Sequence, residues 1–179
     1  MTTEVYKDFQ ASLVLTREKL ATADSLLQQL LLAHAVTLLE VYLQGLVELL
    51  ITSDDKLLLK LAESKHFESQ KLTLAAAIKT NPQKYLLAMV KEFNFHSLGD
   101  TEPLLRQAFN IKITITPELV DLIKLRNDVL HRNARNKAGQ PIELTPDAVL
   151  EATRRIETLV ASADQQAMLL LVEKSGVRF

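Results

Sequence analysis

The chain has 179 residues and a net charge of −1, so we expect one domain with a core of its own and no overall attraction to nucleic acid. It contains no cysteine, which excludes disulfides and thiolate chemistry, and its first residues lack the basic and then apolar order of a signal peptide, so we expect a cytoplasmic protein. A composition with 47% hydrophobic residues, 5% aromatic residues and 4 glycines predicts an all-α, single-domain helical bundle over residues 1–179.

Two long helices are predicted in the first third of the chain. The first covers residues 3–21, and a capping box at Ser25 and Gln28 then opens a long central helix. Residues 26–51 of that helix are apolar on nearly every side and numerous enough to cross a bilayer. Because carboxylates such as Glu40 interrupt the run, and carboxylates in mid-membrane are costly, we expect the central helix of a soluble bundle and no membrane span.

Shorter elements are predicted after the central helix. Their start signals are Ser53-Asp54-Asp55 for one helix and the cap and first-turn pair Asn81-Pro82 for another. Residues 111–115 alternate like a strand, but no other convincing strand offers a partner, so we expect an extended connector. The predicted ranges are a helix ending near residue 62, helices over 68–79, 82–93 and 101–108, a loop over 94–100, and a last helix over 145–174 with a stop at Gly176.

The helix that begins after Thr116 carries the most informative residues. Thr116 is its predicted N-cap, and Pro117 occupies the first helical position. One face is predicted to seek the core, because apolar residues recur along it at helical spacing: Leu119, Leu122, Ile123, Val129 and Leu130. Arg126 projects from the middle of that face, where a guanidinium without a partner is costly. Something at this position therefore requires an arginine.

His131 follows Arg126 by five residues, so on an uninterrupted helix the two side chains point roughly 140° apart. Two arrangements would bring them together: the helix unwinds at His131, or a second copy of the chain completes the site. A plainer interpretation is that Arg126 pairs with a buried carboxylate while His131 interacts with the helix C-terminus. Asn127 lies four residues before His131, on the same face, where the two could touch.

Glu40 is the natural partner for Arg126, because it also interrupts an apolar helix. We predict a contact between them that is structural in role rather than catalytic. The other histidines show no metal-ligand spacing: His34 is expected to be packed or partly exposed, and His66 and His96 lie in predicted loops. Because the chain also has no His-x-x-x-His, clustered acidic pair or Gly-rich phosphate loop, we expect no metal and no cofactor.

The segment from Lys124 to Lys137 is basic. Five basic residues lie there against one acid, Asp128, in the order Lys124, Arg126, Arg132, Arg135 and Lys137. A local positive field beside a histidine suits a phosphodiester. The candidate contacts with RNA phosphate are Arg132, Asn133, Arg135 and Lys137. The plainer interpretation is a solvated loop after a helix end that favours positive charge.

The stretch from Arg126 to His131, Arg-Asn-Asp-Val-Leu-His, resembles the signature of the HEPN superfamily: an arginine, usually followed by a polar residue, and a histidine four to six positions on near a helix end. Its surroundings resemble the RiboL-PSP-HEPN branch. Phe109-Asn110-Ile111 leads into the helix, and a Gly-containing turn and a Thr-Pro helix start follow it. Leu39-Glu40-Val41-Tyr42-Leu43 is similar to the Glu-x-Tyr segment of that branch, and the resemblance runs loosely from about Ser25 to Val160.

The resemblance implies a helical bundle of HEPN type and a metal-independent endoribonuclease that cleaves RNA through attack of the 2′-OH. In that reaction His131 would handle protons, Arg126 would stabilise the phosphate, and Asn127 would orient His131 or the scissile group. Both chains of a homodimer would contribute to one composite site. Such a protein would be a toxin, stress or anti-phage defence effector, with RNA as substrate and an antitoxin or defence protein as a further partner.

A different class of function suits the same residues, namely a non-catalytic HEPN-like dimeric module that binds RNA, a nucleotide or a protein partner. HEPN relatives that lost activity usually lost the arginine or the histidine, and both remain here, which favours the enzyme. Two positions depart from the family pattern. Asn133 stands where toxins paired with a nucleotidyltransferase carry tyrosine, which excludes adenylylation there. Ala134 stands where glycine is common, so a different loop conformation is expected.

Overall fold

The computed structural model describes residues 1–69, 79 and 81–175, and these residues form helices without any named strand. The helices are α1 (Glu4–Leu20), α2 (Ser25–Ser53), α3 (Asp55–Ala62), α5 (Pro82–Glu92), α6 (Leu98–Phe109), α7 (Pro117–His131) and α8 (Pro146–Ser175). The all-α prediction is confirmed. The predicted helix over 68–79 falls mostly outside the described residues, as does the predicted stop at Gly176.

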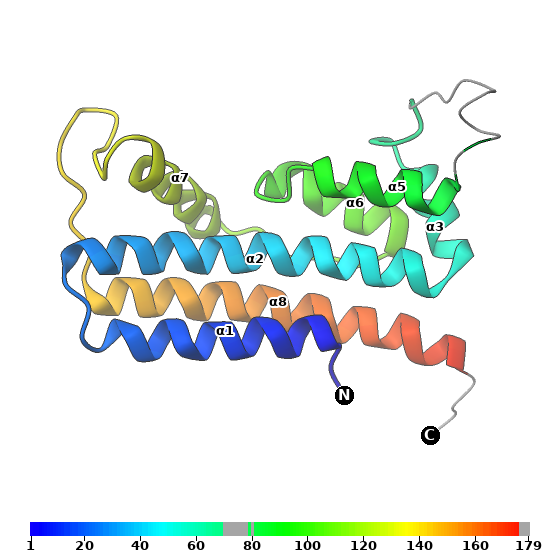
Figure 1. The fold of residues 1–179 in the computed structure, drawn as a ribbon, viewed down its shortest axis with the longest axis horizontal. Coiled ribbons are helices and arrows are strands. Elements are labelled where there is room, and N and C mark those ends of the chain that lie inside the picture. The colour runs from blue at the N-terminus through cyan, green and yellow to red at the C-terminus, as the bar shows by residue number, and fades with distance from the viewer. Residues whose placement is uncertain (70–78, 80, 176–179) are drawn as a thin grey trace.

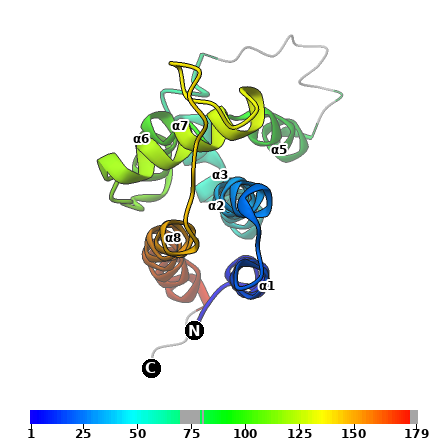
Figure 2. The same cartoon turned by 90° about the vertical axis from the view of Figure 1, so that its left-hand side faces the viewer.

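Three long helices, α1, α2 and α8, run side by side along the molecule (Figure 1). α1 and α8 pack on one side of α2. The shorter helices α3, α5, α6 and α7 lie on its other side, which is clearest in the end-on view of Figure 2. α2 is therefore enclosed between two layers of helices, and the second layer carries Arg126 on α7.

The burial of α2 explains how so apolar a helix is accommodated. Its side chains facing the neighbouring helices include Leu39, Tyr42, Leu43 and Leu50, each at most 2% exposed. By length and composition α2 could cross a membrane, but more than half of its most apolar window is buried within the protein. A helix of this length and composition can lie either in a bilayer or in the core of a protein. Its predicted place as a long central helix is confirmed.

Most of the predicted helix caps are confirmed; these include Asp54, Asn81 and Thr116. The predicted N-cap of α2, Ser25, is wrong by one residue: Asp24 and Ser25 are both good caps, and Asp24 is the one that serves. The carboxylate of Asp24 accepts a hydrogen bond from the Leu27 amide at 2.8 Å, and Ser25 is already helical. α6 begins at Leu98 rather than at the predicted Thr101. Leu98 is buried, and its packing in the core supports an added first turn, although the N-cap Ser97 makes no side-chain hydrogen bond to the helix backbone.

The connector between α6 and α7 is extended, as predicted, and the described residues supply no strand to pair with it. Ile111 and Ile113 are buried while Lys112 between them is exposed. The side chain of Gln166 on α8 takes the place of a neighbouring strand. Its amide accepts from the Lys112 N–H and donates to the Lys112 carbonyl, both at 2.8 Å. This pairing fixes the connector against α8 and so sets where α7 begins.

A buried carboxylate that the sequence analysis missed joins the three long helices. Asp164 on α8 is 1% exposed and accepts hydrogen bonds from both the backbone N–H and the hydroxyl of Thr3, the N-cap of α1. The hydroxyl of Tyr42 on α2 donates to the same carboxylate at 3.4 Å. Burial, and then the charge of Asp164, raise the pKa of Tyr42, which keeps the phenol protonated as a donor.

Replacement of this carboxylate is predicted to destabilise the bundle. Asp164→Ala leaves the buried Tyr42 hydroxyl and the Thr3 donors without their acceptor, and we expect the free energy of unfolding to fall by about 2–4 kcal/mol in urea denaturation. Gln165→Ala is the matched control one residue along on the exposed face, where we expect a change below about 0.5 kcal/mol. Equal effects of the two substitutions would contradict this assignment.

Candidate active site

α7 carries the arginine and histidine of the candidate site, and its start is well defined. The Thr116 hydroxyl accepts from the Leu119 N–H at 3.4 Å, and Pro117 follows as the first helical residue. A hydrogen bond with Thr116 also lowers the pKa of Glu118, which adds a negative charge where the helix dipole favours one. The start of the helix therefore fixes the phase in which every later side chain of α7 projects.

The face of α7 that packs inward is largely the predicted one. Leu119 and Val129 are buried, and Leu122 and Ile123 are half-buried against the core. The prediction for Leu130 is wrong, since its side chain is 45% exposed. Leu130 follows Val129 by about 100° of helical turn, which carries it past the edge of a narrow inward face. The inward face ends at Val129.

Arg126 meets Glu40 where α7 crosses α2. Nη2 of Arg126 lies 3.5 Å from Oε2 of Glu40, and the two side chains are only 15% and 18% exposed. The predicted contact is confirmed. A charge so deeply placed needs a partner of opposite sign, which explains why both helices interrupt an apolar face with a charged residue. Nη1 of Arg126 also donates to Oδ1 of the neighbouring Asn127 at 3.0 Å.

The ion pair is incompletely hydrogen-bonded. Oε1 of Glu40 and Nε of Arg126 are both buried, and neither has a hydrogen-bond partner among the described residues. A separation of 3.5 Å between the charged groups is also longer than a good charge-assisted hydrogen bond. The pair therefore retains a free acceptor and a free donor, which a purely structural ion pair would normally saturate.

A third residue reaches the same carboxylate. Nδ1 of His96, in the loop between α5 and α6, lies 3.6 Å from Oε1 of Glu40. The sequence predicts only that His96 lies in a loop, because His96 is far from Glu40 and Arg126 in the sequence and no motif connects them. α7 and the α5–α6 loop approach α2 from the same side (Figure 1), and this tertiary arrangement alone brings the three residues together.

His131 is the last residue of α7 and is exposed. Because the helix continues unbroken to this residue, the arrangement in which it unwinds to bring the imidazole to Arg126 is wrong. On an intact helix the two side chains point roughly 140° apart. One chain therefore does not unite Arg126 with His131, whereas it does unite Arg126 with Glu40 and Asn127.

The basic segment lies on the surface, and part of its charge is used locally. Nε of Arg132 is 2.9 Å from Asp128, and Nη1 of Arg135 donates to the Gly139 carbonyl at 2.8 Å. Lys124 pairs with Asp121 at 2.8 Å, an acid just outside the counted segment. Asn133 and Lys137 are exposed. The local positive field is therefore weaker than the count of residues indicates, although every one of these groups remains open to an incoming phosphate.

The backbone at the end of α7 shows how Ala134 is accommodated at a position where glycine is common in the HEPN pattern. Asn133 and Ala134 both adopt left-handed backbone angles, with φ of 52° and 54°. The Ala134 N–H reaches back to the Val129 carbonyl at 3.3 Å, which is the closing bond of a Schellman cap. An alanine thus occupies a conformation that glycine adopts without strain. The segment that leaves α7 is tied back to α2, where the Gln29 amide donates to the Ile142 carbonyl at 2.9 Å.

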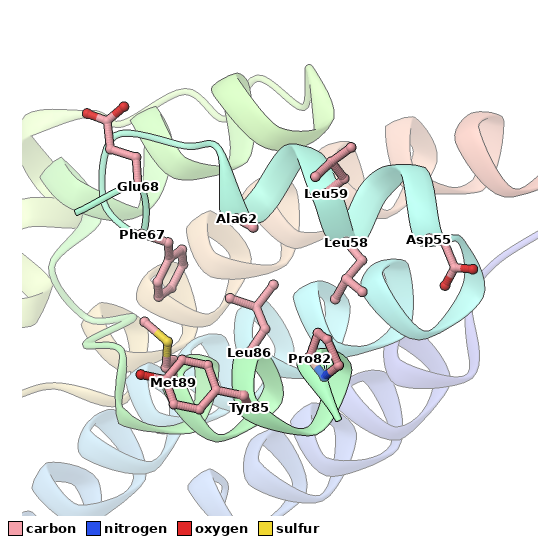
Figure 3. Close-up of a pocket in the computed structure, with 10 residues that line it drawn as sticks. All are labelled: Asp55, Leu58, Leu59, Ala62, Phe67, Glu68, Pro82, Tyr85, Leu86 and Met89. Carbon is pink, nitrogen blue, oxygen red and sulfur yellow. The ribbon is translucent and has the colours of Figure 1, made fainter. Parts of the chain in front are cut away.

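A separate hollow of about 510 Å³ lies between α3 and α5, away from these residues (Figure 3). Leu58, Phe67 and Leu86 point into it, while Asp55 and Glu68 lie on its rim. Its lining is apolar and includes two carboxylates but no basic residue. Such a surface does not attract phosphate, so the hollow is not a continuation of the candidate site.

No family model, curated protein or solved structure matches this chain. The resemblance to HEPN proteins therefore depends on the residues from Arg126 to His131 and their surroundings. In the part of the chain that the structure describes, no three or more His, Asp or Glu side chains gather as they do in a metal site. The chemistry open to the candidate site is that of a guanidinium, a carboxylate, an amide and imidazoles.

Coupling between Glu40 and Arg126 is testable with a double-mutant cycle. Glu40→Gln and Arg126→Met each leave one half-buried charge without its partner, so we expect each to destabilise the fold by about 2–4 kcal/mol and the pair to couple by more than about 1 kcal/mol in urea unfolding. The exposed pair of Lys124 and Asp121 is closer, at 2.8 Å, yet should couple by less than about 0.5 kcal/mol. Similar coupling in both pairs would contradict the importance of burial here.

The left-handed backbone at Ala134 leads to a second prediction, which concerns stability. Ala134→Gly is expected to raise the free energy of unfolding by about 0.5–1 kcal/mol, because the left-handed conformation costs alanine more than glycine loses in chain entropy. Ala148→Gly, on the exposed first turn of α8, is the matched control and should lower stability by a similar amount. A loss of stability in both variants, measured by thermal and urea unfolding, would show that Ala134 is not strained.

Proposed function

We propose that this protein is a metal-independent endoribonuclease of HEPN type that cleaves RNA through attack of the 2′-OH. The observation that carries the proposal is the position of Arg126 on α7, where it is half-buried and paired with Glu40 of α2. Arg126 is also the first residue of the Arg-Asn-x-x-x-His sequence that ends at His131. A guanidinium placed at such structural cost, with 15% of its side chain exposed, suits the recognition of a phosphate.

The reaction needs a base, a cation and an acid. The base takes the proton of the ribose 2′-OH as the 2′-oxygen attacks the neighbouring phosphorus, which forms a 2′,3′-cyclic phosphate and breaks the bond to the 5′-oxygen. Arg126 stabilises the charge that develops on the phosphoryl oxygens. The acid protonates the departing 5′-oxygen. His131 takes one of the two proton roles, and Asn127, which already contacts Arg126, positions the phosphate or the guanidinium.

A homodimer accounts for the divergence of Arg126 and His131. Because one chain points them roughly 140° apart, a two-fold axis near the end of α7 would place Arg126 of one chain beside His131 of the other. The exposed Arg132, Asn133, Arg135 and Lys137 would then border the shared site and bind the RNA backbone. Toxin, stress or anti-phage defence activity in the cytoplasm, with an antitoxin or defence partner, belongs to this proposal.

The same divergence also supports a second candidate function. An exposed His131 that does not reach Arg126 within the chain is what a non-catalytic HEPN-like module would show. Such a module would bind RNA, a nucleotide or a protein partner as a dimer, with the pair of Arg126 and Glu40 serving stability alone.

The decisive measurement is cleavage of a labelled RNA in EDTA. We expect the wild-type protein to leave ends with a 2′,3′-cyclic phosphate, and His131→Ala and Arg126→Lys to lower the rate by about 10²-fold or more, as loss of a proton-transfer group or a phosphate donor does. His34→Ala and Arg154→Ala remove an exposed histidine and an exposed arginine elsewhere and should leave the rate unchanged.

Mixing the two inactive variants tests the composite site. In a dimer that carries both variants, one site combines the intact Arg126 of one chain with the intact His131 of the other, so activity should return on mixing. A site within one chain would give no recovery. Absence of cleavage by the wild-type protein across several RNAs, together with RNA binding, would favour the binding module.

A further inference from the structure

The carboxylate of Glu40 joins three segments that are far apart in the sequence. Its Oε2 faces Nη2 of Arg126 on α7 at 3.5 Å, and its Oε1 faces Nδ1 of His96 in the α5–α6 loop at 3.6 Å. His96 therefore lies beside the candidate phosphate-binding arginine within a single chain. His131, on the other side of α7, does not.

The loop that carries His96 is anchored on both sides of the imidazole. Phe95 before it is 4% exposed, and the Thr101 hydroxyl contacts the carbonyls of Phe95 and Ser97 at 3.2 and 3.0 Å. The Leu98 N–H also donates to the carbonyl of His96 itself at 3.0 Å. The backbone thus holds the imidazole at Glu40, as the support of a working side chain requires.

The geometry favours one particular imidazole nitrogen for chemistry. A carboxylate that faces Nδ1 keeps the proton on Nδ1 and leaves Nε2 as the unprotonated nitrogen, which is the form that accepts a proton. The separation of 3.6 Å is longer than a hydrogen bond, and such contacts commonly tighten when substrate binds. The His96 side chain is 38% exposed, so a substrate can reach it, while Glu40 behind it is only 18% exposed.

We propose that His96 is the general base of the RNA cleavage reaction and that Glu40 is its positioning residue; this inference rests on the proposed ribonuclease function. Nε2 of His96 takes the proton of the 2′-OH while the 2′-oxygen forms its bond to phosphorus. Arg126, on the other oxygen of the same carboxylate, stabilises the phosphoryl oxygens. The bond to the 5′-oxygen breaks, and the protonated imidazole of His131 from the second chain of the proposed dimer gives that oxygen its proton. His96 thus supplies the second proton-transfer group that the reaction needs in addition to His131.

The first test compares RNA cleavage in EDTA by wild type, His96→Ala and His96→Gln. We expect kcat to fall by about 10²-fold or more with KM within about threefold, because the base acts in the transition state rather than in binding. The melting temperature should change little, since the imidazole is partly exposed and makes no hydrogen bond to the described residues, only the 3.6 Å contact with Glu40. His34→Ala, an exposed histidine on α2, is the matched control. A kcat within threefold of wild type for both His96 variants would overturn the inference.

The second test separates a base from an acid or a structural group. In an RNA with a sulfur in place of the scissile 5′-oxygen, the departing thiolate needs no acid, but the 2′-OH still needs a base. His131→Ala should therefore recover towards the wild-type rate on this substrate, while His96→Gln should stay slow. Recovery of His96→Gln instead would make His96 the acid and overturn the assignment.

The role of Glu40 predicts non-additive effects. Glu40→Gln keeps the size of the side chain but loses the charge that faces both His96 and Arg126, so it should slow cleavage clearly less in a chain that already carries His96→Gln than in the wild type. If the rate reductions of the two single variants multiplied in full in the double variant, Glu40 would not act through His96. A wild-type protein inert on both RNA and the sulfur-containing substrate would instead refute the ribonuclease function itself, and the inference with it.

Discussion

The need to cover α2 on all sides organises this protein. A long helix that is apolar around most of its circumference is stable in water only when neighbours remove that surface from solvent, and α1 and α8 do so on one side while α3, α5 and α7 do so on the other. A charged residue of α2 that faces the neighbouring helices needs a partner inside the packing. Glu40 is such a residue, and its partner Arg126 reaches it where α7 crosses α2.

Two carboxylates on the long helices show how differently a buried charge can be treated. Asp164 accepts from the backbone and hydroxyl of Thr3 and from the hydroxyl of Tyr42, so its surroundings saturate it and it joins three helices. Glu40 has the guanidinium of Arg126 at 3.5 Å and the imidazole of His96 at 3.6 Å but retains a buried oxygen without a hydrogen bond. Buried polar groups whose hydrogen bonds are all made stabilise a fold. Buried polar atoms without a hydrogen-bond partner, beside partly exposed imidazoles, are typical of sites that act on a ligand.

The unbroken end of α7 places His131 and His96 in different surroundings. Because the helix continues to His131 and closes with a Schellman cap, this imidazole faces outward, where a second chain can use it. His96 faces inward to the same carboxylate as Arg126 and belongs to its own chain. In the proposed ribonuclease, the dimer would therefore bring an acid to a cation and base that each chain already holds together.

Local and periodic features of this chain were readable from its sequence, because caps, helix period and the cost of a buried charge act over a few residues. They determined the all-α class, the central helix, the start of α7 and the pairing of Glu40 with Arg126. Tertiary packing alone decided three other features: the exposure of Leu130 at the edge of a narrow face, the burial of Asp164 at a three-helix junction, and the arrival of His96 at Glu40. No sequence period relates those residues to their partners, since each contact depends on how whole helices cross.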